Sequence, residues 1–353
     1  MATIDSHPSR CSRTMPRVCP LREPNGPRIA TLLMGASIAT ALTGCVAVTP
    51  QRTTPRPADF RAASEGETIR LGDARFEVEV RLRDPTPRAK YGPRFDETAR
   101  VSSVRLEGRE FLEAPGLAGE FGIMGLGVLG YDEADVGDAF IKPGVGLLRR
   151  DGDLEYRFHY AYPMIEAWPV LVARDGEGGL IVHQSSIPLA GYAYRLEKRF
   201  RVNADHRGLE ITYRLENVGS RRFVFDHYNH NWLALGGGAT GETTYIEPGF
   251  DLPPLPMTWL TRKGERYYFR RDLSDGDRLY FPYFHPVEPS RSGLVVGNRE
   301  TGAVVTLEPG LRMSRFALYA EAGSVCPERF FRDELRPGEA AHWQRRYQFD
   351  LGR

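Results

Sequence analysis

The sequence predicts an all-β protein whose folded part is one large antiparallel β-sandwich. Short runs in which apolar and polar residues alternate recur from about Ile69 to Phe349, with turn-forming residues between them. The 353 residues include 37 glycines and 26 prolines, as expected for a chain with many turns. No segment has a convincing helical periodicity of three or more turns, which argues against an α/β arrangement.

The first 44 residues predict a secretion signal that is not part of the fold. Arg22 and Arg28 precede an apolar run, residues 29–42, which has the length of a signal-peptide core and is short for a bilayer span. The run ends in Leu42-Thr43-Gly44-Cys45, which looks like a bacterial lipobox. That resemblance implies cleavage before Cys45 and lipid on this cysteine, and several acyl chains would anchor the protein stably. An ordinary secretory cleavage site is the alternative.

A lipid on Cys45 predicts a location in the bacterial cell envelope, facing the periplasm. Val46 and Ala47 follow the cysteine, and the absence of aspartate there favours the outer membrane by resemblance to enterobacterial sorting. Removing residues 1–44 and lipidating Cys45 leaves Cys326 as the remaining cysteine, so no intramolecular disulfide is expected. A single free thiol is most often buried.

After the signal, the chain divides into a tether and one domain. Residues 45–66 are rich in proline, threonine and arginine and predict an extended, flexible tether. Residues 67–353 predict the sandwich, with about fourteen strands. The clearest strand runs are residues 75–82, 101–106, 154–162, 180–187, 192–202, 209–215, 223–231, 266–269, 279–284, 293–296, 303–307, 316–320 and 342–349.

Period-two alternation is cleanest in residues 192–197, 209–215 and 225–230. In the last of these, alternation puts Asp226, Tyr228 and His230 on one face of the strand and His227 and Asn229 on the other. Two histidines three residues apart on a strand cannot easily share one metal ion, so no metal site is expected here. His230 is then either a buried, hydrogen-bonded structural residue or a general acid, because imidazole titrates near neutral pH.

Composition and motifs exclude several other function classes. The chain has 47 Lys and Arg against 46 Asp and Glu, so there is no electrostatic case for a nucleic-acid partner. Gly125 to Gly130 match G-x-G-x-x-G, but too few residues follow before the next glycine for the helix that a dinucleotide site needs. No cofactor is therefore expected. No serine lies in G-x-S-x-G and Cys326 lacks a matching signature, so nucleophilic catalysis has no support. A glycosidase-like pair of carboxylates stays open.

The segment around His230 resembles a known superfamily. Asn229-His230-Asn231-Trp232-Leu233 is similar to the Asn-His-x-aromatic-aromatic motif of galactose mutarotases, also called aldose 1-epimerases. The tail is similar too, with Val325-Cys326-Pro327-Glu328, then Arg336-Pro337-Gly338-Glu339 and a closing strand. The runs 94–96, 119–121 and 140–146 look like an uncharacterised subgroup of the same superfamily. The resemblance covers about residues 69–349 and implies the galactose mutarotase-like supersandwich.

The resemblance also implies a function, the interconversion of sugar anomers without a cofactor. His230 would be the general acid at the ring oxygen and Glu328 the general base at the C1 hydroxyl, with Glu321 a nearby competitor for the second role. The candidates for sugar contacts are Arg94, Asp96, Lys142, His227, Tyr228 and Asn231.

The chain departs from the superfamily pattern at one place. Family members usually carry a second active-site histidine well before the Asn-His motif, but residues 121–146 contain none. His227 could replace it only if a β-bulge reversed its face. A carbohydrate-binding envelope lipoprotein without catalysis is therefore the alternative function.

Overall fold

The computed structural model describes residues 56–352, apart from residues 153, 253–257 and 284. The predicted signal peptide, Cys45 and residues 45–55 of the predicted tether lie outside the described residues. Within the described part, no helix is long and apolar enough to cross a bilayer. Its one α-helix is a single turn, α1 (Arg88–Tyr91), and its 3-10 turns are η1 (Pro57–Asp59), η2 (Leu235–Gly237) and η3 (Pro289–Arg291). The prediction that long helices are absent is confirmed for these residues.

The strands form two large sheets and one small one, and every strand pairing is antiparallel. In spatial order, the 11-stranded sheet contains β1 (Arg61–Ala62), β10 (Val170–Arg174), β11 (Leu180–Ser185), β12 (Tyr194–Val202), β13 (Gly208–Asn217), β23 (Ala340–Leu351), β20 (Ala303–Leu307), β19 (Leu294–Asn298), β15 (Thr244–Pro248), β17 (Arg266–Phe269) and β16 (Leu260–Lys263). The 9-stranded sheet contains β18 (Leu279–Tyr283), β21 (Arg315–Glu321), β22 (Ser324–Leu335), β14 (Phe223–Leu233), β6 (Leu112–Phe121), β4 (Ala99–Leu106), β3 (Phe76–Leu82) and β2 (Glu67–Gly72), with β5 (Arg109–Glu110) paired to β4. The small sheet contains β7 (Ala139–Lys142), β8 (Gly146–Arg149) and β9 (Met164–Glu166).

The two large sheets pack face to face. The rings of Phe225 in β14 and Trp343 in β23 have centroids 5.5 Å apart, and those of Phe76 in β3 and Phe349 in β23 are 5.7 Å apart. One apolar cluster draws its residues from both sheets. The predicted all-β sandwich is therefore confirmed.

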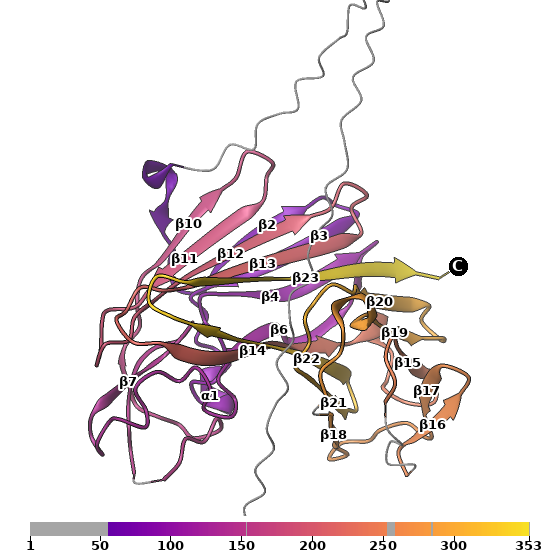
Figure 1. The fold of residues 1–353 in the computed structure, drawn as a ribbon. Coiled ribbons are helices and arrows are strands. Elements are labelled where there is room, and N and C mark those ends of the chain that lie inside the picture. Colours follow the sequence, from indigo (N-terminus) through magenta and orange to yellow (C-terminus); the bar gives the residue numbers. More distant parts are fainter. Residues whose placement is uncertain (1–55, 153, 253–257, 284, 353) are drawn as a thin grey trace, which may run out of the picture. The chain divides into compact units, whose positions relative to one another are not determined.

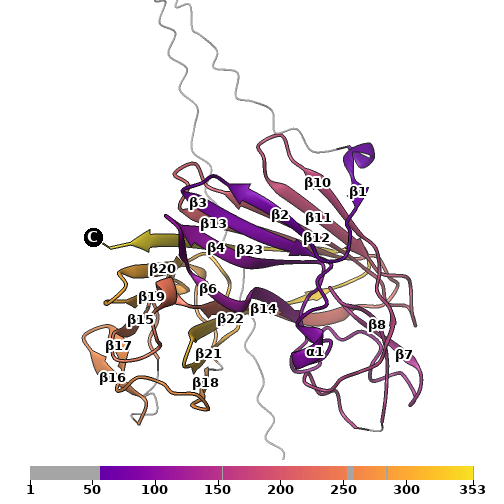
Figure 2. The ribbon, with the colours of Figure 1, turned by 180° about the vertical axis from the view of Figure 1, so that it is seen from behind.

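The central strands of the 9-stranded sheet are also covered on the face that points away from β13 and β23. Figures 1 and 2 show α1 and the β7 region beyond β14, on the side opposite to β23. Two segments supply this cover. Phe95 pairs with Glu120 of β6, and the backbone of residues 122–126 bonds to Asp226 of β14. Gly127, with φ of +98°, permits the close approach, because a Cβ there would lie 2.7 Å from Cβ of Phe225.

Burial on both faces explains which strands the sequence did not reveal. The first eight residues of β22 and the last seven of β6 are all buried. Nearly every residue of β14 is buried too, although its run was predicted as a strand. Strands covered on both sides lose the polar-apolar alternation that marks a half-exposed strand. The described residues form 23 strands where about fourteen were predicted, and β6 and β22 are among the additional ones.

One other prediction needs correction. Residues 154–162 were predicted as a strand, but the described part of this run is irregular, with Leu154 exposed and the rings of Tyr156 and Tyr162 stacked 5.4 Å apart. β1 at residues 61–62, within the segment predicted as the tether, pairs with β10. The buried free thiol expected at Cys326 is found.

Candidate functional site

Strand β14 separates two sets of polar side chains by simple alternation. Asn229 contacts Tyr213 and Tyr347 of the 11-stranded sheet, so the odd-numbered residues point between the two sheets. Tyr228 and His230 instead point to the outer face, under the covering segments. The predicted division of the strand into two faces is therefore correct, and it decides which residues surround His230.

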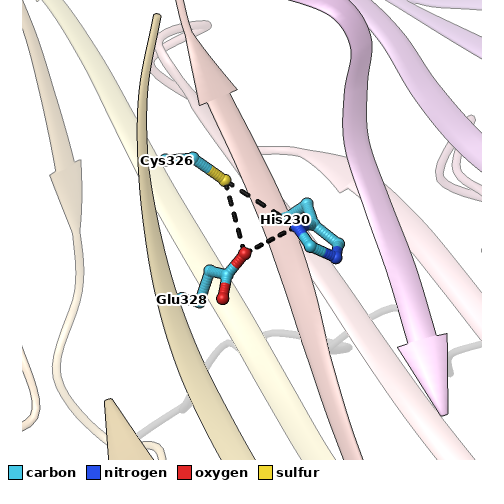
Figure 3. Close-up of side chains that lie close together, drawn as sticks. All are labelled: His230, Cys326 and Glu328. Carbon is cyan, nitrogen blue, oxygen red and sulfur yellow. Dashed lines mark hydrogen bonds and ion pairs between the residues drawn. The ribbon is translucent and has the colours of Figure 1, made fainter. Parts of the chain in front are cut away.

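His230 and Glu328 are in direct contact on this outer face. Nδ1 of His230 lies 2.6 Å from Oε1 of Glu328, which comes from the neighbouring strand β22 (Figure 3). The two residues are only 6% and 4% exposed. The structure thus brings together the two residues that the sequence singled out as acid and base. Glu321, the competing candidate, accepts a hydrogen bond from Tyr319 at the end of β21.

A second carboxylate contacts the other ring nitrogen of His230. Oε2 of Glu120 lies 3.0 Å from Nε2 of His230, accepts a hydrogen bond from the Tyr228 hydroxyl at 2.6 Å, and pairs with Arg94 at 2.8 Å. Glu120 is completely buried. Sequence reasoning missed this residue as a site member, because β6 was not recognised as a strand. The one available signal was the run 119–121 in the family resemblance.

The charges around Glu120 shift its pKa. Burial alone would raise the pKa of this carboxyl, but Arg94, the hydrogen bond from His230 and the nearby Lys142 outweigh burial and lower it to about 2. Burial lowers the pKa of Lys142 to about 8, against the opposing effect of Glu120. For Arg94, the attraction of Glu120 and Tyr228 exceeds the effect of burial, so its pKa is raised. Glu120 is therefore held as an anion between cations.

Aromatic rings enclose the histidine. The ring of Trp232 stacks on His230 with centroids 4.6 Å apart, and the ring of Tyr228 lies at the same distance in a tilted arrangement. Phe95 meets the imidazole edge-on at 5.0 Å. These contacts restrict the ring to one orientation, with Nδ1 toward Glu328 and Nε2 toward Glu120.

The predicted sugar-contact residues fall into two groups. Arg94 and Tyr228 touch the His230 cluster directly, as described above. Lys142 comes from β7 in the covering segment and donates hydrogen bonds to the Phe121 carbonyl at 2.9 Å and to the Tyr156 hydroxyl at 2.6 Å. Its charge acts on Glu120. These three residues therefore stay candidates for ligand contacts.

Asp96, His227 and Asn231 lie elsewhere. Asp96 forms a buried ion pair with Lys198 at 2.8 Å. His227 accepts a hydrogen bond from Trp343 at 3.1 Å, and Asn231 accepts one from Tyr347 at 2.9 Å. The placement of all three at the interior side of the sheet argues against contact with a ligand beside His230. The bulge that would have turned His227 around is absent from its position, because the irregularity in the β14–β6 ladder falls between Asn231 and Leu233.

Metal-ligating side chains also converge here. Among the described residues, one group of three such side chains lies close enough together to hold a metal ion. It consists of His230, Cys326 and Glu328. The expectation that His227 and His230 cannot share a metal ion agrees with their opposite directions, but that expectation did not consider Cys326.

Comparison with known proteins identifies the fold. No protein-family model matches the sequence, and no curated protein matches it either. Among solved structures, a galactose mutarotase-like protein from Lactobacillus casei has a TM-score of 0.50 at 11% identity, covering 80% of this chain and 100% of that one. An aldose epimerase homologue from C. elegans has a TM-score of 0.49 at 12% identity, covering 81% and 99%. The first of these supports the conclusion that this chain has the galactose mutarotase-like fold, as the Asn-His motif predicted.

Proposed function

We propose that this protein is an aldose 1-epimerase-like isomerase that interconverts the anomers of a sugar, with His230 as general acid and Glu328 as general base. The observation that carries the proposal is the contact between Nδ1 of His230 and Oε1 of Glu328, 2.6 Å apart on adjacent strands. The fold supports the class of reaction only by analogy, since one fold hosts many functions. The chemistry is therefore argued from the pair.

Opening a sugar ring requires two proton movements at once. In the proposed reaction, Glu328 accepts the proton of the C1 hydroxyl while His230 donates a proton to the ring oxygen, which breaks the bond between C1 and that oxygen. Rotation about the C1–C2 bond and reversal of both transfers then close the ring as the other anomer, and the protons balance. Each positioned acid or base typically contributes about 10²–10⁴ in rate.

The neighbours of His230 suit this role. Contact of Nε2 with Glu120 fixes the imidazole so that Nδ1 is the nitrogen directed at Glu328. Oε1 of Glu120 is buried and has no hydrogen-bond partner among the described residues, so it is an acceptor that a sugar hydroxyl would satisfy. Trp232 and Tyr228 supply aromatic surface beside the reacting groups.

A carbohydrate-binding protein without catalysis is the second candidate, and one observation favours it. His230 and Glu328 bond to each other and are nearly closed to solvent. A sugar has to separate them before either group can act. The lack of a histidine in residues 121–146 points the same way.

Polarimetry of the purified protein with freshly dissolved α-glucose and α-galactose tests the proposal. We expect faster anomer equilibration with the wild type, and equilibration at the uncatalysed rate with His230→Ala and with Glu328→Gln. His342→Ala is the matched control, because His342 is exposed on β23. Absence of acceleration by the wild type with both sugars rejects simple aldose mutarotation. Thermal stabilisation by sugar without turnover would then support the binding protein.

We further propose that the protein is a lipoprotein of the bacterial cell envelope, anchored through Cys45, with the outer membrane as its site. The lipobox-like Leu42-Thr43-Gly44-Cys45 supports this proposal. Metabolic labelling with a radioactive fatty acid tests it. We expect label on the wild type and none on Cys45→Ser. Equal labelling of both proteins contradicts it, and fractionation of the two membranes tests the location.

A further inference from the structure

Cys326 adds a sulfur atom to the pair formed by His230 and Glu328. Its Sγ lies 4.0 Å from Nδ1 of His230 and 3.8 Å from Oε1 of Glu328 (Figure 3). All three side chains are buried, and their nitrogen, sulfur and oxygen atoms lie within 4.8 Å of one another. The anomerisation chemistry proposed above uses the imidazole and the carboxylate and leaves the thiol without a role.

The backbone holds these three groups in place. Cys326 and Glu328 are two residues apart on β22, so both point to the same face of the strand. His230 comes from β14, which is hydrogen-bonded to β22. Ligands on neighbouring strands of a sheet are positioned more rigidly than ligands on loops.

Two further contacts are of the kind that surrounds metal ligands. Nε2 of His230 is bonded to the Glu120 carboxylate at 3.0 Å, so Nδ1, which contacts Glu328, is the ring nitrogen directed at the other two ligand atoms. A carboxylate on the second nitrogen is the usual partner of a metal-bound histidine, because it fixes the ring and raises its basicity. In addition, the backbone N–H of Asn231 donates a hydrogen bond to Sγ of Cys326 at 3.2 Å. This bond opposes burial and the charge of Glu328, which together raise the pKa of the thiol well above its ordinary value.

We propose that Nδ1 of His230, Sγ of Cys326 and Oε1 of Glu328 bind a zinc ion. Mixed nitrogen, sulfur and oxygen ligands suit Zn²⁺, and three protein ligands leave a fourth tetrahedral position for water or another small ligand. Tetrahedral zinc separates its ligand atoms by roughly 3.3–3.6 Å. Nδ1 and Oε1 are 2.6 Å apart, so they need to move apart by less than about 1 Å. Binding displaces the thiol proton, and any proton on the ligand nitrogen, to solvent, with no change in oxidation state.

Metal binding at these atoms has a consequence for activity, and this consequence rests on the function proposed above. Zinc would occupy both atoms that move protons in anomerisation. Metal binding and general acid–base catalysis by this pair would therefore exclude each other. Zinc would act as an inhibitor of the same site, and its removal by a chelator would restore turnover.

Titration of the metal-free, full-length protein with Co²⁺ tests the site without any activity assay. Four-coordinate cobalt bound to a thiolate gives a sulfur-to-metal charge-transfer absorption and strong visible bands. We expect both with the wild type, and we expect Zn²⁺ to abolish both by displacing the cobalt. Cys326→Ser should lose the charge-transfer absorption and bind Co²⁺ at least about tenfold more weakly. His342→Ala is the control for a histidine outside the cluster and should match the wild type.

A second variant keeps the test decisive if Cys326→Ser folds poorly by circular dichroism. Glu120→Gln keeps the size of the side chain and removes the charge that contacts His230 and Arg94, and it should weaken cobalt binding by about 10–100-fold. Equal cobalt spectra from wild type and Cys326→Ser, or no cobalt binding by the wild type, would overturn the proposal. Because these spectra do not depend on turnover, they distinguish failure of the metal site from failure of the proposed isomerase activity.

Discussion

His227 and His230 lie three residues apart on the same strand and have opposite environments. His227 is fully buried between the two sheets, where burial, followed by the charges of Arg345 and Lys198, lowers its pKa well below the usual range. It is therefore neutral and accepts a hydrogen bond from Trp343. His230 points to the other face, with a carboxylate against each ring nitrogen.

The contrast teaches that the neighbours, and not the residue type, decide what a histidine can do. Around His227 there are aromatic rings and cations, which favour the neutral imidazole and give no route for a proton. Around His230 there are two carboxylates within hydrogen-bond distance, one at each ring nitrogen, which give the ring polar partners on both sides. The difference arises because one step along a strand reverses the face.

The largest expected effect is on catalytic activity, which should be lost on substitution of His230 and kept on substitution of His227. His230→Ala should lower the rate of anomer equilibration by about 10²–10⁴-fold, because it removes the proposed general acid. His227→Gln should retain activity per folded molecule, since it lies on the opposite face. Polarimetry on variants whose folding has been checked by circular dichroism measures both. Equal loss in the two variants would contradict the assignment of chemistry to one face.

The next largest effect is on the free energy of unfolding, to which the interior His227 should contribute. His227→Ala should lower the free energy of unfolding by about 2–4 kcal/mol, because it opens a cavity beside Trp343 and leaves the indole N–H without its acceptor. His342→Ala, on the exposed face of β23, should change it by less than about 0.5 kcal/mol. Urea denaturation measures both changes. A loss at His227 no larger than that at His342 would show that the interior histidine is not a packing residue.

The sequence revealed the parts of this fold and site whose pattern is visible on one strand. Alternation in β12 and β13 was readable because buried and less buried positions alternate along them. β14 is buried on both faces, but counting its residues by twos correctly placed Tyr228 beside His230 and His227 opposite. Glu328 was found only through resemblance of the tail to a known family. Its contact with His230 joins residues almost 100 positions apart.

The remaining site residues could not be read from a local pattern. Glu120 lies in β6, where burial of both faces removes the alternation, and the cover that buries it comes from other segments. Asp96 was grouped with the site on family resemblance alone, and Asn231 as part of the Asn-His motif, but both side chains point to the interior. Cys326 was expected to be buried, yet nothing in its own strand showed that its sulfur lies beside Nδ1 of His230.

A smaller effect concerns Lys142, the buried cation on the His230 side of β14. Its pKa of about 8 in the folded protein lies below the usual 10.5, so the unfolded chain binds more protons between these values. The contribution of Lys142 to stability should therefore rise with pH from about 8 to about 10.5, by up to about 3 kcal/mol. The groups that face it are Glu120, Arg94, Asp226 and the Tyr156 hydroxyl.

Denaturation of the wild type and of Lys142→Met across this pH range checks whether the contribution of Lys142 to stability rises with pH. The difference in stability between wild type and variant should shift in favour of the wild type as pH increases, while Lys263→Met, at an exposed position of β16, should show no such trend. A difference that stays constant with pH would mean that Lys142 is not a strained cation.

The smallest expected effect tests Asp226, which shares the outer face of β14 with His230. Burial raises its pKa to about 6, against the opposing attraction of Arg315 and Arg332, with Glu120 adding to the increase. The folded protein thus binds more protons than the unfolded chain between about pH 4 and pH 6, and stability from this residue is lost as pH rises through that window.

Asp226→Asn keeps an oxygen to accept the hydrogen bond from the Gly122 N–H. It should be about 1–2 kcal/mol more stable than wild type at pH 7 and no more stable at pH 4. Chemical denaturation at both pH values measures this, and a destabilised variant at pH 7 would show that the two arginines outweigh the cost of burying the carboxylate.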